Sequence, residues 1–170
     1  MRYPIVLFLA VIGAPATAQE PPAPACPATP VQLPPEFAGW ASAAPVSAAA
    51  SAADLGKARA RLGSRADVTL LPAAQVQFVA PERPTAAGTF SGLISFSVPV
   101  ARTYRIALGA PAWIDVVRDG KPVASGAHGH GVACTAVRKT VDFALTPGNY
   151  VLQVSGNHAA TVSVMILPLP

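Results

Sequence analysis

The stretch TFSGLISFSV, residues 89–98, decides the fold class because its side chains alternate in kind along the chain. One parity carries large apolar residues and the other carries hydroxyls: Phe90, Ile94, Phe96 and Val98 against Thr89, Ser91, Ser95 and Ser97. A period of two is the signature of a β-strand with one buried face. The stretch therefore predicts a strand at the core of a β-protein.

The same alternation continues along the chain on both sides of this stretch. The apolar members are Tyr104, Ile106 and Leu108; Val141, Phe143 and Leu145; Tyr150, Leu152 and Val154; and Val162, Val164 and Ile166. Together with segments 68–71, 76–79 and 114–117, they predict about eight strands. Asp119-Gly120 is typical of a tight hairpin turn, and Pro147-Gly148 and Gly156-Asn157 predict further turns. Short, regularly spaced strands without intervening helices favour an all-β antiparallel sandwich or jelly roll, with a closed barrel as the alternative.

The N-terminal residues have the pattern of a secretory signal peptide. Arg2 precedes an apolar run from Ile5 to Ile12, and the small residues Ala16-Thr17-Ala18 supply a cleavage site. We therefore expect residues 1–18 to be removed and the protein to be periplasmic or secreted. No later segment is apolar over the roughly 20 residues that a transmembrane helix needs, so we expect no transmembrane segment in the mature chain.

Three further segments follow the signal. Residues 19–46 are proline-rich, which predicts an extended strap, and Phe37 and Trp40 are expected to pin it to the domain. Residues 47–64 are alanine-rich, with Asp54 before several bases, which predicts one short helix. We expect residues 65–170 to form the β-sandwich domain. The formal net charge of +4 is modest and no aromatic residues interleave with the bases, so nucleic acid is not an expected partner.

A glycine-rich stretch, residues 125–134, carries most of the residues with chemical potential, and we expect it to be a loop between two strands. His128 and His130 are two apart, so on extended backbone both imidazoles project to one side and could ligate a metal together. His158 is the only other histidine and would complete a three-histidine site if it lay nearby. Iron(II) or another divalent metal would then be the cofactor. The alternative is a solvated loop with unliganded histidines.

The two cysteines, Cys26 and Cys134, favour a disulfide, because cysteines of exported proteins normally pair. The bridge would tie the strap to the histidine stretch. Two other interpretations are weaker. Trp113 and Tyr104 would line a sugar-binding face or belong to the core, and Ser125, His128 and Asp115 or Asp119 lack the surroundings of a serine triad.

Two resemblances add expectations. From Gly88 onward, and most specifically over 143–150, the chain resembles the bacterial pre-peptidase C-terminal domain, which implies a non-catalytic β-sandwich. Nearly the whole mature chain looks like short exported bacterial proteins labelled homogentisate 1,2-dioxygenase. The residues that carry this likeness are 112–121, 128–131, Cys134, Arg138-Lys139, 33–36 and 39–40. That resemblance implies an iron enzyme that opens an aromatic ring, with two histidines and a carboxylate on a cupin fold. His128-Gly129-His130 matches the cupin His-any-His element, whereas Cys134 stands near where the cupin motif has glutamate.

These observations favour an exported single-domain β-sandwich with a binding or envelope-structural role. Its partner would be an envelope protein, a glycan or a small ligand. The alternative function is a mononuclear iron dioxygenase that acts on an aromatic substrate through His128 and His130.

Overall fold

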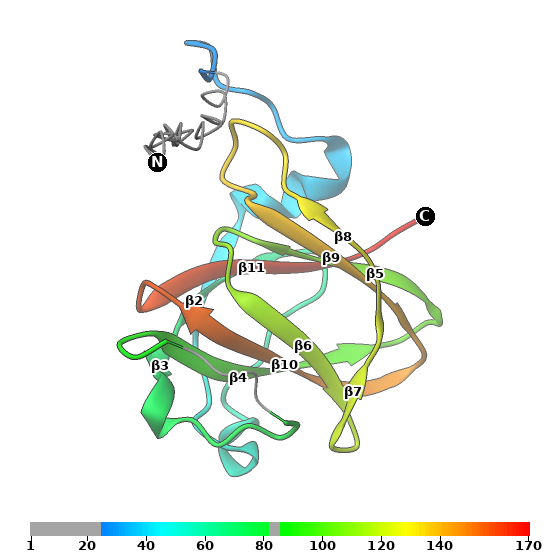
Figure 1. Ribbon diagram of the computed structural model, residues 1–170. Helices are drawn as coiled ribbons and strands as arrows, with labels where there is room; N and C mark the ends of the chain where they lie inside the picture. Colours follow the sequence, from blue (N-terminus) through cyan, green and yellow to red (C-terminus); the bar gives the residue numbers. More distant parts are fainter. Residues whose placement is uncertain (1–24, 82–85) are drawn as a thin grey trace, which may run out of the picture.

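A computed structural model describes residues 25–81 and 86–170, which fold into two β-sheets packed face to face (Figure 1). The predicted β-sandwich is confirmed. The predicted signal peptide, residues 1–18, lies outside the described residues. Within the described part of the chain, no helix is long and apolar enough to cross a membrane.

The first sheet has six strands in the order β1-β2-β11-β5-β9-β8. Their bounds are β1 Ala43–Ser47, β2 Arg65–Thr69, β11 Thr161–Pro168, β5 Arg102–Leu108, β9 Lys139–Leu145 and β8 Ser125–His130. The second sheet has five strands in the order β3-β4-β10-β6-β7. Their bounds are β3 Leu71–Pro72, β4 Phe90–Val98, β10 Gly148–Asn157, β6 Trp113–Arg118 and β7 Lys121–Val123. All pairings are antiparallel except that of β1 with β2.

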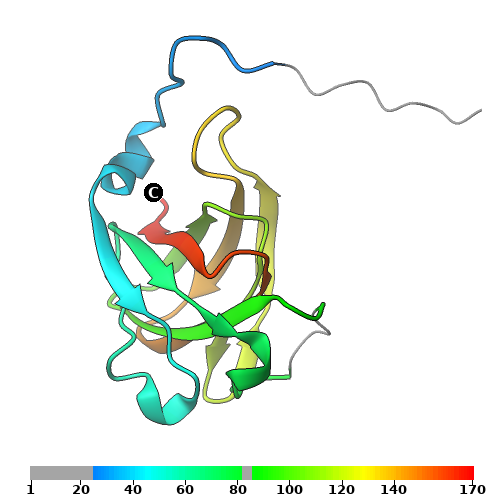
Figure 2. The ribbon, with the colours of Figure 1, turned by 90° about the vertical axis from the view of Figure 1, so that its left-hand side faces the viewer.

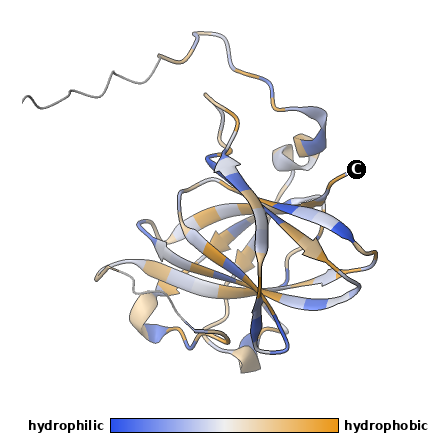
Figure 3. Ribbon diagram, turned by 45° about the vertical axis from the view of Figure 1, so that its right-hand side comes forward, coloured by the Kyte–Doolittle hydropathy of each residue, from blue (hydrophilic) through white to orange (hydrophobic). Residues whose placement is uncertain are grey.

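The core lies between the two sheets and is built from the predicted apolar parity. Ile94 of β4 faces Leu152 of β10, and Phe96 faces Tyr150, whose ring stacks on that of Phe96 at 5.5 Å between centroids. Side chains that face one another across paired strands share a sheet face, so each strand adds its alternate residues to the same interior. Apolar stretches accordingly recur along the strands of both sheets in Figure 3.

Covering segments bury the outer faces of both sheets, which the alternation alone did not predict. Leu93 of β4 is fully buried beneath Ala49 and Ala58, and the carboxamide oxygen of Gln153 accepts hydrogen bonds from the backbone of Val79 and Ala80 at 2.7 and 2.9 Å. Phe37 and Trp40 cover the other sheet, on Ala107, Met165 and Leu167. The prediction that these aromatic residues pin the strap to the domain is thus confirmed. Figure 2 shows the strap, in blue, beside the sheets.

The segments before β2 differ from their predicted structure. The alanine-rich segment 47–64 forms one turn of 3-10 helix, η2 Ala52–Asp54, and the strap forms η1 Pro35–Ala41 followed by β1. The small side chains of the alanines let this segment lie close to the backbone of β4, and the segment does not form the predicted helix. Ala49 bridges to Leu93, and a Cβ atom at neighbouring Gly92 would lie 2.4 Å from the Cβ of Ala48. Residues 76–79 also form no strand; a third 3-10 turn, η3 Ala73–Gln75, precedes them.

The predicted Asp119-Gly120 hairpin is confirmed, and it joins β6 to β7. Both residues have positive φ, 50° and 73°, as the twist of a two-residue hairpin requires. Of the predicted Pro147-Gly148 turn, Gly148 is the first residue of β10. Gly156 and Asn157, predicted as a second turn, lie inside β10 at a register shift. The turn that follows falls at residues 158–160.

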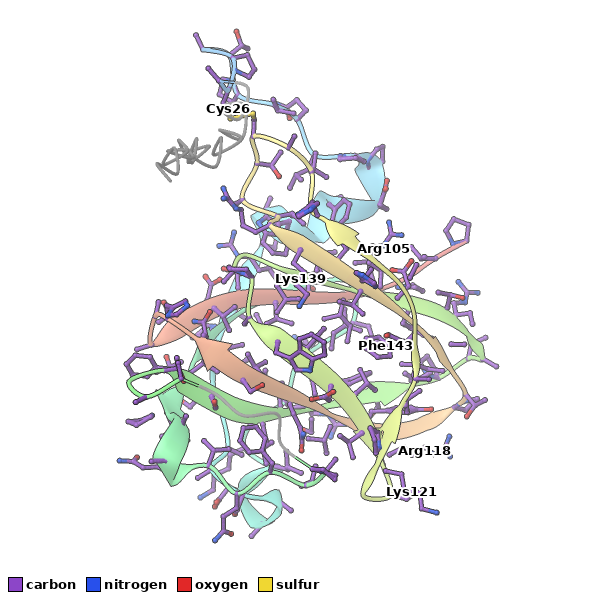
Figure 4. All side chains as sticks on the ribbon, viewed as in Figure 1. Cys26, Arg105, Arg118, Lys121, Lys139 and Phe143 are labelled. Atoms are coloured by element: carbon purple, nitrogen blue, oxygen red, sulfur yellow. A yellow bond between two sulfur atoms is a disulfide. The ribbon has the colours of Figure 1, made fainter. Side chains whose placement is uncertain are left out.

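The structure pairs Cys26 with Cys134 in a disulfide, as the sequence predicts, with 5.4 Å between their Cα atoms and 108 residues between them in sequence. The bridge joins the strap to the loop between β8 and β9 (Figure 4). Closing so long a loop removes many conformations from the unfolded chain.

Replacing both cysteines by serine should lower the free energy of unfolding by about 2 to 4 kcal/mol. Chemical denaturation of the oxidised protein and of the double variant measures the difference. The double variant should also be insensitive to dithiothreitol, whereas the wild-type protein should lose the same stability on reduction. Equal stability of all four samples would contradict the prediction.

Candidate functional site

The predicted histidine loop is largely a strand. Residues 125–130 form β8, the edge strand of the six-stranded sheet, and only 131–138 form a loop. In the pairing with β9, His128 faces Val141, Gly129 faces Thr140 and His130 faces Lys139. Pairing with β9, whose residues alternate regularly, places this glycine-rich segment in the sheet. All six residues of β8 remain exposed.

His128 and His130 lie on the face of the sheet that looks toward the second sheet. Each is directly opposite an inward-facing residue of β9, Val141 or Lys139, and opposite residues share a face. The two imidazoles are therefore on one side of the strand, as their spacing predicts. Because β8 is the outermost strand, both lie at the open margin of the sandwich.

His158 is not part of this arrangement. His130 faces Lys139, Lys139 faces Leu108 and Leu108 faces Val164, so three strand spacings, about 14 Å, separate His130 from β11. His158 precedes β11 and lies in the turn that joins β10 to it. Across residues 25–81 and 86–170, no three histidine, cysteine or acidic side chains come together to hold a metal ion.

The other ligands that an iron centre would require are already engaged. Cys134 is in the disulfide. Asp142, the next carboxylate after the histidines, points to the outer face of the sheet and forms a bidentate pair with Arg105, at 2.8 Å to both Nε and Nη2. This hydrogen-bonded pair raises the pKa of Arg105 above its ordinary value. The residues present do not fit the two-histidine, one-carboxylate iron site that the dioxygenase resemblance implies.

A cleft of about 730 Å³ opens at the same margin, between β6 and β7 of one sheet and β8 and β9 of the other. The chain passes from the five-stranded to the six-stranded sheet here, through the short link between β7 and β8. The lining residues are Pro81, Trp113, Ile114, Asp115, Pro122, Val123, Ala124, Ser125, His128, Lys139, Val141 and Phe143.

The floor of this margin cleft is the end of the hydrophobic core. Ile114 of β6 and Val141 and Phe143 of β9 are all at most 6 % exposed and belong to the main core cluster. Val123 packs against the same cluster. A ligand in the cleft would therefore meet apolar side chains continuous with the protein interior.

Lys139 provides the polar wall of the cleft. It begins β9 in phase with Val141 and Phe143, so its side chain runs inward (Figure 4). Its Nζ donates a hydrogen bond to the backbone oxygen of Ala112 at 2.8 Å and lies 5.1 Å from the centre of the Trp113 ring. Burial lowers the pKa of Lys139 from its ordinary 10.5, and the negative charge of Asp115 opposes part of that change.

Trp113 and Asp115 stand side by side on β6. The indole Nε1 of Trp113 donates a hydrogen bond to the Asp115 carboxylate at 3.3 Å. Trp113 is 41 % exposed. Tyr104, its proposed companion on a sugar-binding face, is a core residue, and its hydroxyl donates to the backbone oxygen of Val100. The two aromatic residues therefore form no common face.

From the sequence, His128 and Trp113 are candidate site residues, whereas Lys139 is expected to flank the start of a strand and not to bind an anion. Lys139 does begin β9, and it also lines the cleft. A signal was present, because Lys139 shares the parity of Val141 and Phe143 and therefore had to point inward at the start of β9. Trp113 is out of phase with Ile114 and Val116, which indicates a position away from the main core. What the sequence could not show was that the ends of β6 and β9 face each other across one cleft.

The chain matches no model of a known protein family, and a search of curated proteins finds no significant match. The geometry of the cleft is therefore what bears on the function of this protein.

We expect the His128→Ala, His130→Ala double variant to retain the wild-type metal content and thermal stability, because two exposed imidazoles supply too few ligands for tight retention. Elemental analysis of protein purified without chelators or a histidine tag provides the measurement. Stoichiometric iron or zinc in the wild-type protein, lost in the double variant, would contradict this expectation.

Proposed function

We propose that the protein is an exported, periplasmic or secreted binding module that holds ligands in the margin cleft. The ligand class that fits best has an apolar body and an anionic end. The observation that carries this proposal is the placement of Lys139, a cationic side chain that enters an apolar cleft without a carboxylate in ion-pair contact among the described residues.

The apolar part of the argument comes from the floor. Ile114, Val141 and Phe143 can contact a hydrocarbon or aromatic group, whose transfer from water is favourable at about 25 cal/mol per Å² of buried apolar surface. The 41 % exposed Trp113 adds a broad side chain at the rim. Pockets that bind small molecules commonly combine such a lining with a few polar groups that orient the ligand.

The anionic part comes from Lys139. Its ammonium group contacts a neutral carbonyl and an aromatic ring, and its partial burial disfavours the charged form, as the lowered pKa records. A carboxylate placed beside Nζ would favour that charge and form a charge-assisted hydrogen bond. Asp115 is already engaged with Trp113 and does not lie within ion-pair distance of Lys139.

A binding role also agrees with the polar groups at the rim. Ser125 and His128 both line the cleft, yet within the described chain no hydrogen bond joins them, and Asp115 bonds to Trp113 instead of orienting the imidazole. A serine nucleophile needs both of those contacts. The cleft thus offers groups that recognise a ligand and lacks a preformed catalytic relay.

Decanoate and decanol form a matched pair of probes for this proposal, since they share a hydrocarbon chain and differ in charge. We expect isothermal titration calorimetry to show decanoate binding at least about tenfold more tightly than decanol, and Lys139→Gln to remove that preference. Lys57→Gln, which removes the same charge from an exposed position outside the cleft, should bind like wild type. Equal binding of both probes, or an unaffected Lys139→Gln variant, would contradict the proposal.

Decanoate binding should weaken with rising pH, starting below pH 10.5, because burial lowers the pKa of Lys139 and the neutral amine no longer attracts a carboxylate. Stability without ligand should move in the opposite direction. Between the lowered pKa and 10.5 the unfolded chain binds more protons, so the free energy of unfolding should rise with pH relative to Lys139→Gln. Calorimetric titrations and urea denaturation between pH 7 and 11 measure both trends, and parallel curves for the two proteins would refute the assignment.

A further inference from the structure

The two sheets have four edge strands, β1 and β8 in one and β3 and β7 in the other, and one of the four differs in its residue types. Three edges contain a proline: Pro45 in β1, Pro72 in β3 and Pro122 in β7. Proline has no N–H to donate, and natural proteins use it on edges to prevent further strand pairing. The fourth edge, β8, contains neither proline nor an acidic, lysine or arginine side chain, and all its residues are exposed. β8 is therefore the edge left competent to pair.

The backbone groups that β8 presents at this edge follow from its pairing with β9. The N–H of Gly131 donates to the carbonyl of Arg138 at 3.0 Å, which makes these two residues a hydrogen-bonded pair. Antiparallel pairs alternate between hydrogen-bonded and non-hydrogen-bonded, so His130–Lys139 and His128–Val141 are non-hydrogen-bonded pairs. The N–H and C=O groups of His128 and His130 consequently point away from β9, toward the open edge. The register shift between Ser125 and His128 lies on the other side of this region.

The open edge and the margin cleft share residues. Ser125 and His128 belong to β8 and also line the cleft, and Lys139 lies on the next strand. A strand added to β8 would place alternate side chains on the inner face, beside His128 and His130 and above the cleft. One such side chain would approach the Lys139 ammonium group, and its neighbour two residues away would approach the apolar floor.

We propose that β8 binds an extended segment of a partner protein by strand addition, with an acidic side chain of that segment directed toward Lys139 and an apolar one directed toward Val141. This inference rests on the proposed function of the cleft and specifies its ligand. A second copy of β8 satisfies the cleft less well, since residues 125–130 contain no carboxylate to pair with Lys139. Charge also favours an acidic partner, because the chain carries a formal net charge of +4.

The probe is a blocked hexapeptide, acetyl-Thr-Glu-Thr-Leu-Thr-Val-amide, in which the glutamate and leucine share one face of an extended chain. Two control peptides separate the contributions. One replaces the glutamate by glutamine, and the other carries N-methyl groups on the backbone nitrogens of the glutamate and the leucine, whose N–H groups face β8 in an antiparallel addition opposite His130 and His128. We expect each control to bind at least about tenfold more weakly than the parent, because the first loses the charge and the second loses main-chain hydrogen bonds.

The matched protein variants are His130→Pro and His130→Ala. Both remove the imidazole, but only proline removes the outward-facing N–H, and it spares the bonds between β8 and β9 because His130 makes none with Lys139. We expect His130→Pro to abolish peptide binding while decanoate binding persists, and His130→Ala to retain both. As a direct reading that needs no variant, peptide saturation should slow hydrogen exchange of the His128 and His130 amides in the wild-type protein by at least about tenfold.

Equal peptide affinity of His130→Pro and His130→Ala, or unchanged exchange at His128 and His130, would overturn the strand-addition proposal. Binding of decanoate without binding of the peptide would overturn it too, while leaving the proposed function intact. A wild-type protein that dimerises through β8, with His130→Pro monomeric by analytical ultracentrifugation, would replace the partner segment by a second copy. Failure of decanoate to bind would instead refute the proposed function of the cleft.

Discussion

The packing of two sheets through one parity of apolar side chains is the constraint on which the other features depend. It requires each strand to turn its alternate residues inward. The chain passes from one sheet to the other between β7 and β8, at the margin of the sandwich. A cleft opens at this margin, and core residues such as Phe143 form its floor. The candidate site is thus a product of the sandwich architecture and not an insertion into it.

β9 illustrates how one strand supports two different electrostatic solutions. On its outer face, Asp142 meets Arg105 in a bidentate pair that satisfies both charged groups. On its inner face, Lys139 contacts a carbonyl and an aromatic ring, and burial lowers its pKa. A strand dominated by packing would be expected to hold an apolar residue at that inner position. Proteins that depart from packing rules in this way commonly do so at functional sites.

Most of the sandwich could be predicted from residues with a strong local signal. The alternation over 89–98 predicts strand β4, and the Asp119-Gly120 pair predicts the hairpin between β6 and β7, because each signal depends on neighbouring residues alone. The disulfide follows from there being only two cysteines in the sequence. The failures have a common cause. The alanine-rich segment 47–64 has helical propensity, but its small side chains serve tight packing over Leu93, and the glycine-rich β8 becomes a strand only because β9 lies beside it. The cleft depends on contacts between segments distant in sequence, which periodicity does not report.

The position of β11 has a consequence for how the molecule is made. This strand is the last in the chain, yet it lies inside the six-stranded sheet between β2 and β5, both of which precede it by many residues. Neither half of that sheet can join the other until the C-terminal residues are available. Folding dominated by such distant pairings is slow, because the entropy of closing long loops is lost before the contacts form. A nascent chain with this topology therefore leaves the six-stranded sheet incomplete until residues 161–168 have been made.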